Sequence, residues 1–173
     1  MFVHLKNRAL LRVSGTDAET FLQGQLSNDI SKLDALSVQL NAYCQHQGKI
    51  LALFWVMRHE DSFLLSFPSD LLEVIQPRLQ MFVIMSDVVI EDVTKEHIQV
   101  GSIDETHQEA LVINEKLSLI ITDRQDISQF NMEPIEHWDM ACVDSSLPEI
   151  FSITSEKLVP QMLNLEIDDF GVN

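Results

Sequence analysis

A run of eight apolar residues, Ile50 to Met57, constrains the fold of this 173-residue chain more than any other feature. A glycine and a lysine precede the run, and an arginine follows it. Such a bounded apolar run is typical of a strand buried on both faces, although periodicity alone leaves a buried helix open. Its content of Ile, Phe, Trp and Val favours the strand. Together with residues 40–46, the run predicts a hairpin that turns at Gln47-Gly48 in the middle of a sheet.

Local patterns along the rest of the chain predict further strands and helices. Strands are expected at 2–5, 9–13, 62–67, 83–90, 97–102 and 117–122, and helices from 16, from 68, at 104–110 and around 134–143, followed by a turn at Pro148. Thr16 with Glu19 three residues later fits a capping box at the start of the first helix. Pro77 lies inside the second helix and is expected to bend or split it, because proline lacks the amide donor.

The order of these elements predicts an α+β fold with a discontinuous domain. From the hairpin to residue 122 the order is β-β-β-α-β-β-α-β, which is typical of a ferredoxin-like unit with an extra strand. The segment from residue 127 onward has too few strands for a sheet of its own. We therefore expect a domain of residues 1–38 plus 127–173 around an inserted ferredoxin-like domain of residues 39–126.

Composition excludes several classes of function. The chain has 27 acidic and 11 basic residues, a formal charge of −16, and no basic cluster, so direct nucleic-acid binding is not expected. Its longest apolar run is far below the roughly 20 residues of a membrane-spanning helix, and charges interrupt the N-terminus where a signal peptide is apolar. Two cysteines form no disulfide framework. We expect a cytoplasmic protein with no membrane partner.

Few motifs carry chemistry by themselves. Cys44 and His46 lie two residues apart on one face of a strand, where half of a metal site or a partly buried thiol are both open interpretations. The adjacent acidic pairs Glu91-Asp92 and Asp168-Asp169 are expected on solvated surface. The sequence has no G-x-S-x-G, P-loop or G-x-G-x-x-G motif, so hydrolase, NTPase and dinucleotide functions have no support.

Three segments, in this order, resemble the YgfZ proteins, folate-binding relatives of the glycine-cleavage T-protein, which is an aminomethyltransferase. They are residues 11–30 with G-T-D-A-E-T-F-L-Q-G-Q-L-S-N-D-I, residues 44–50 with the Gly48-Lys49 turn, and residues 158–165 with L-V-P-Q-M-L-N-L. The resemblance implies the aminomethyltransferase folate-binding fold, with folate in the central opening. It also implies a folate-dependent role in the maturation or repair of iron–sulfur proteins, including a tRNA-modifying enzyme.

The sequence departs from this family in two ways that affect function. It stops before the segment K-G-C-Y-x-G-Q-E and the C-terminal barrel, so the resemblance covers only the N-terminal part and the barrel is expected to be absent. Aligned on Gly48, the catalytic aspartate of the T-protein falls at Ala52 and Leu53. Neither side chain can accept a proton or stabilise a developing positive charge. Aminomethyl transfer is therefore not expected.

The resemblance also implies which residues bind tetrahydrofolate. Trp138 matches the tryptophan of the family segment W-x-x-L-x-I-E-A-G-x-P, Asp144 stands at its glutamate and Ser146 at its glycine. A carboxylate there can accept two hydrogen bonds from the pterin. Arg8 replaces a tryptophan of some members and is expected to pair with the glutamate tail of folate. A core role for Trp138 and a solvated helix end or cap at Asp144 remain open.

Three functions are therefore compatible with the sequence. The first is a tetrahydrofolate-binding protein of iron–sulfur protein maturation and, through it, tRNA modification. The second is an acidic interaction module that docks a basic partner and has lost folate binding. The third, an aminomethyltransferase, is disfavoured by Ala52 and Leu53.

Overall fold

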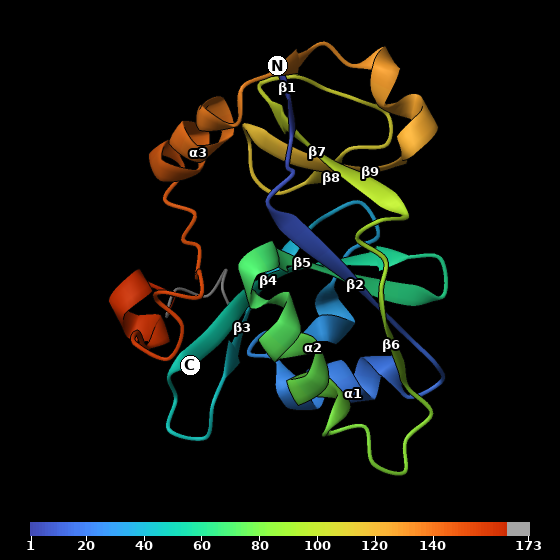
Figure 1. The fold of residues 1–173 in the computed structure, drawn as a ribbon, viewed down its shortest axis with the longest axis vertical. Coiled ribbons are helices and arrows are strands. Elements are labelled where there is room, and N and C mark those ends of the chain that lie inside the picture. The colour runs from blue at the N-terminus through green and yellow to red at the C-terminus, as the bar shows by residue number, and fades with distance from the viewer. Residues whose placement is uncertain (166–173) are drawn as a thin grey trace.

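The computed structural model describes residues 1–165, apart from the side chains of residues 124–126. The acidic pair Asp168-Asp169 lies outside the described residues. As expected, the fold is α+β, with two five-stranded sheets and three α-helices in the described part (Figure 1). The strands are β1 (Phe2–His4), β2 (Arg8–Ser14), β3 (Gln39–Cys44), β4 (Ile50–His59), β5 (Ser62–Pro68), β6 (Val89–Asp92), β7 (His97–Ile103), β8 (Leu111–Val112), β9 (Leu117–Asp123) and β10 (Met132–Glu133). The helices are α1 (Ala18–Gln25), α2 (Leu72–Gln80) and α3 (Ile135–Asp144).

The predicted hairpin forms the β3–β4 pair of the first sheet, whose strand order is β3-β4-β5-β2-β6. All eight residues from Ile50 to Met57 are buried. Residues such as Phe54 and Val56 pack in a core with α1 and α2, whereas Trp55 and Met57 pack toward β1, β9 and α3. The run is continuous because β4 has a hydrophobic layer on each face.

The second sheet has the order β10-β1-β7-β9-β8, and α3 lies against it (Figure 1). α3 covers the predicted helix around 134–143 and buries Trp138 and Cys142, four residues apart on one face. Trp138 packs on Gly101 of β7, where the absence of a side chain leaves room for the indole. The contact therefore brings α3 close to the sheet, where Cys142 packs in the same core cluster as Trp138.

The inserted ferredoxin-like arrangement is not confirmed. β2 pairs with β5 and β6 in the first sheet, whereas β1, only a few residues earlier, pairs with β7 and β10 in the second. Strands from the first 38 residues thus contribute to both sheets, because order along the chain does not determine which strand edges meet. The division into residues 1–38 plus 127–173 and residues 39–126 stays a prediction.

Two expected elements are wrong in whole or in part. The strand expected at 83–90 is present only from Val89, and the preceding residues form a loop that exposes Phe82, Ile84 and Met85. Residues 104–110 form no helix; their turns lead into the short strand β8. In the first segment Val83 and Val88 still contact the core, but the apolar residues between them are exposed. The second segment has a single apolar residue, Ala110, so it has no apolar face that a helix could bury.

The first two helices also differ from expectation in detail. Asp17 rather than Thr16 is the N-cap residue of α1, and no side chain caps the helix. Thr16 donates instead to the carboxylate of Asp87 at 2.9 Å, and Glu19 pairs with Arg58, so long-range partners replace the capping box. α2 continues through Pro77 to Gln80 and is not split. No helix in the described part is both long and apolar enough to cross a membrane.

Replacing Gly101 with alanine should lower the free energy of unfolding by about 1–3 kcal/mol, because overpacking a tight core contact forces side chains apart. A Cβ at this position would lie 2.3 Å from Cε3 of Trp138. Gly24→Ala in α1 is the matched control, since nothing lies within 4 Å of its added Cβ, and this variant should be as stable as the parent or more stable. Urea unfolding followed by circular dichroism measures both, and equal stability of the two variants would contradict the packing argument.

Candidate functional site

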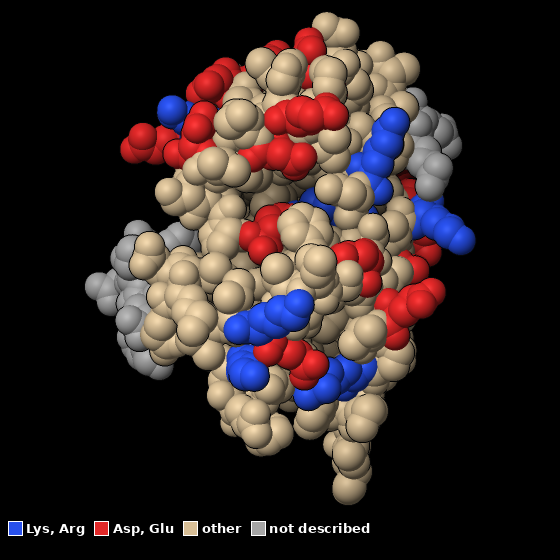
Figure 2. Space-filling model, turned by 60° about the vertical axis from the view of Figure 1, so that its left-hand side comes forward, with Lys and Arg blue, Asp and Glu red and all other residues tan. Residues whose placement is uncertain are grey.

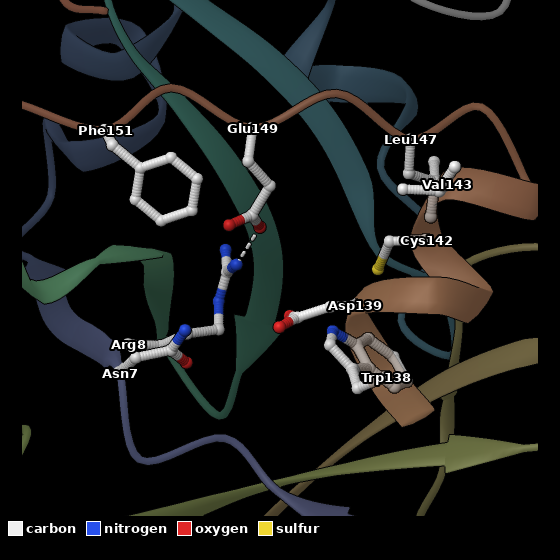
Figure 3. Close-up of a pocket in the computed structure, with 9 residues that line it drawn as sticks. All are labelled: Asn7, Arg8, Trp138, Asp139, Cys142, Val143, Leu147, Glu149 and Phe151. Carbon is white, nitrogen blue, oxygen red and sulfur yellow. Dashed lines mark hydrogen bonds and ion pairs between the residues drawn. The ribbon is translucent and has the colours of Figure 1, made fainter. Parts of the chain in front are cut away.

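A hollow of about 350 Å³ lies between α3, the start of β2 and residues 147–151 (Figure 3). Its walls combine aromatic and aliphatic side chains with three charged groups. The lining residues are Asn7, Arg8, Trp138, Asp139, Cys142, Val143, Leu147, Glu149 and Phe151. Two of the three predicted folate contacts, Arg8 and Trp138, therefore meet in one cavity.

Trp138 forms one wall of the hollow and also belongs to the core. Its side chain is only 3% exposed, and its ring meets that of Trp55 edge to face at a centroid distance of 5.8 Å. Gly101 also packs closely against the benzene part of the indole. The two alternatives for Trp138 are thus compatible: it is a core residue that leaves part of its surface on the cavity.

Arg8 is a buried, fully engaged cation. Its residue is 4% exposed, and its guanidinium donates to the hydroxyl of Ser66 at 2.7 Å and to the Ser66 carbonyl at 3.1 Å. It forms an ion pair with Glu149 and stacks on Trp55, with Cζ 3.6 Å from the ring centroid. A folate tail would have to compete with Glu149 for this guanidinium, so the expected role of Arg8 is already filled by a residue of the chain.

The Arg8 contacts continue into a buried polar network between the two sheets. Ser66 on β5 donates to the side-chain oxygen of Gln99 on β7. The side-chain amide of Gln99 donates to the carbonyls of Arg8 and Ala9 at 3.3 and 3.2 Å. Burying polar groups is unfavourable unless they are paired, so this network fixes how the sheets sit against each other.

Asp144, the third predicted contact, lies elsewhere. It is the last residue of α3, is exposed to solvent and does not line the hollow. The carboxylates that do line it are Asp139 and Glu149, which motif matching missed. The helical period could have indicated Asp139. Asp139 and Val143 are four residues apart and directly follow Trp138 and Cys142, so they lie next to that pair on the helix surface. Only the fold brings Glu149 to Arg8, 141 residues earlier in the chain.

The thiols at the site and on the hairpin are protonated at neutral pH. Burial, followed by the negative charge of Glu149, raises the pKa of Cys142 to about 12. Burial also raises the pKa of Cys44. Among the side chains that the structure describes, no group of three or more His, Cys, Asp or Glu residues is arranged to hold a metal ion. Neither cysteine is therefore set up as a nucleophile or as part of a recognisable metal centre.

The hairpin positions Ala52 and Leu53 are both buried, with exposures of 0% and 2%. They pack in the core with α1 and α2 and contribute no polar atom to the cavity beside α3. A second hollow of about 430 Å³ is lined by Trp55 and Leu147 together with polar residues that include Lys32, Gln39 and Asn114. It contains none of the predicted site residues, so the cavity beside α3 is the stronger candidate.

Comparisons with known proteins confirm the resemblance to YgfZ. An uncharacterised protein from Haemophilus influenzae is 29% identical over 171 residues, which cover 95% of this chain and 60% of the relative. Proteins named tRNA-modifying protein YgfZ from Vibrio atlanticus and Photobacterium profundum are 23% and 22% identical over 96% of this chain. The matches span 58% and 59% of those proteins, so the chain spans about three fifths of the length of these curated relatives. No family model matches the chain.

The fold has a counterpart among solved structures. The glycine cleavage system aminomethyltransferase T from Bartonella henselae superposes with a TM-score of 0.52 at 17% identity. The superposition covers 58% of this chain and 27% of the aminomethyltransferase. At this identity the likeness concerns the fold alone, and it supports the expected relation to the aminomethyltransferase fold.

Glu149→Gln should lower the free energy of unfolding by about 3 kcal/mol, because it leaves a buried guanidinium without its countercharge. The Arg8 side chain is 3% exposed and that of Glu149 is 20% exposed. Glu19→Gln is the control, since the side chains of the Arg58–Glu19 pair are 34% and 47% exposed, respectively. Loss of this pair should lower the free energy of unfolding by less than about 1 kcal/mol. Denaturant unfolding measures both, and similar small losses would show that Arg8 does not depend on Glu149.

Proposed function

We propose that this chain, as a relative of the YgfZ proteins, binds tetrahydrofolate in the hollow beside α3. We further propose that it acts in the cytoplasm in the maturation or repair of iron–sulfur proteins, and thereby in tRNA modification. The observation that carries the binding proposal is the meeting of Trp138, Arg8 and two carboxylates in one cavity. The names of the relatives from Vibrio atlanticus and Photobacterium profundum support the link to tRNA modification.

The chemistry of the hollow suits a flat heterocycle with hydrogen-bond donors. Its volume of about 350 Å³ is at the lower end of small-molecule sites. Phe151, which is 40% exposed, supplies aromatic surface on one side, Trp138 adds the edge of a largely buried ring, and Asp139 supplies acceptor oxygens between them (Figure 3). A reduced pterin offers both an apolar face and N–H groups, so each part of the lining has a counterpart on the ligand.

The proposed role is binding without group transfer. Ala52 and Leu53 occupy the hairpin positions at which the T-protein has its aspartate, and both side chains are buried in the core. Direct contact with tRNA is not part of the proposal, because a formal charge of −16 repels a polyanion. The link to tRNA modification would therefore pass through a client enzyme.

Val143→Arg should weaken tetrahydrofolate binding by about tenfold or more, because it places a long charged side chain on the wall of the hollow. Val143 is 72% exposed, so the substitution leaves the core intact. Met140→Arg is the matched control: Met140 is 62% exposed on the same helix and does not line the hollow. Anaerobic titration calorimetry with tetrahydrofolate measures the affinities. Absence of binding to the parent chain, or equal affinity of both variants, would refute the site.

A second candidate function, docking of a basic protein partner, is favoured by the surface charge. α3 carries Glu136, Asp139 and Asp144 and no lysine or arginine. Figure 2 shows acidic side chains predominating over the upper part of the face that it presents. Such a surface attracts a cationic partner and would do so independently of folate.

In this second case, the chain should bind an octalysine peptide. The affinity should decrease as the salt concentration is raised from about 50 to about 300 mM, because salt screens the attraction between the charges. The variant Glu136→Lys/Asp144→Lys should lose more affinity than Glu60→Lys/Asp61→Lys, which makes the same charge change on the exposed β4–β5 turn. Fluorescence anisotropy of a labelled peptide provides the measurement. Equal losses in the two variants would mean that net charge, rather than the α3 surface, drives the binding.

A further inference from the structure

The hollow beside α3 contains one acidic group, Asp139, that is not paired with any residue that the structure describes. Arg8 and Glu149 form an ion pair, so their charges compensate each other. Asp139 makes no side-chain hydrogen bond or ion pair with any described residue. The charged groups of the lining therefore sum to one negative charge, and a bound molecule with hydrogen-bond donors can pair with the exposed Asp139 carboxylate.

Asp139 is placed to meet a ligand. Figure 3 shows its carboxylate in the middle of the lining residues, between the indole of Trp138 and the Arg8–Glu149 pair. The position is consistent with the electrostatics of Cys142, because Glu149 and Asp139 both raise the pKa of that thiol. A donor-bearing ring bound between Phe151 and α3 could present its edge to this carboxylate.

We infer that Asp139 is the carboxylate that recognises the ligand, and that it selects heterocycles with an amino group beside a ring N–H. This inference rests on the proposed tetrahydrofolate site and adds the residue that sets its specificity. A carboxylate accepts two parallel hydrogen bonds from such an edge, whereas a carbonyl oxygen in place of the amino group removes one donor and turns its lone pairs toward the carboxylate.

The other two acids near the site are less suited to this role. Glu149 already accepts from Arg8, and turning it toward a ligand would leave a buried guanidinium unpaired. Asp144 is exposed at the end of α3 and lies outside the lining. Asp139 alone combines a place on the wall with free acceptor oxygens among the described side chains.

The test compares tetrahydropterin with tetrahydrolumazine, in which a carbonyl oxygen replaces the amino group. Anaerobic titration calorimetry gives the affinity ratio for the full chain and for two variants, Asp139→Asn and Asp144→Asn. Both variants remove one charge from an exposed position of α3, so neither should change the unfolding midpoint. The parent chain should prefer the pterin by about 10- to 100-fold, as expected for a hydrogen bond to a charged group.

The preference should fall to within about threefold in Asp139→Asn and persist in Asp144→Asn. A third variant, Asp139→Glu, keeps the carboxylate and should retain the preference in weakened form. A preference that survives in Asp139→Asn, or that disappears only in Asp144→Asn, overturns the assignment of Asp139 while leaving pterin binding intact. Failure of the parent chain to bind tetrahydropterin and tetrahydrofolate overturns both the assignment and the proposed function.

Discussion

The buried guanidinium of Arg8 is the interaction on which the arrangement of this molecule depends. A cation that is 4% exposed is tolerated only when its charge and its donors are paired. Ser66 of β5, Glu149 of the segment after α3 and the face of Trp55 meet this requirement from three different parts of the chain. Gln99 extends the network from Ser66 to the second sheet, so one charge links both sheets and the C-terminal segment.

The candidate site follows from this constraint. Pairing with Arg8 brings Glu149 to the start of β2, and residues 147–151 consequently face α3 across a gap. The gap is the hollow. The pairing also explains why Arg8 serves the fold more directly than it serves a ligand, since each of its three guanidinium nitrogens already donates to a residue of the chain. A site built in this way has one acid reserved for structure and one left free for binding.

The parts of the fold that depend on local pattern could be predicted, and the parts that depend on long-range pairing could not. The Ile50–Met57 run identified β4, and the helix expected around 134–143 is present as α3, because both elements have a recognisable local sequence pattern. Nothing local indicates that β1 and β2 join different sheets, or that Thr16 bonds Asp87 instead of capping its own helix. The resemblance named Trp138 and Arg8, and the structure places both at one hollow, whereas the presence of Glu149 there required the structure.

The motif alignment and the helix geometry select different acidic residues of α3: the motif selects Asp144, whereas Asp139 lines the hollow. Residues advance by about 100° around an α-helix, so four residues return almost to the starting direction. Asp139 and Val143 are related in this way, and both line the hollow. Asp144 is five residues from Asp139, about 140° further round the helix, and faces solvent. Alignment of the motif assigns the acid by its place in the chain, but the direction of a helical side chain decides whether it reaches the cavity. For this helix the geometry favours Asp139.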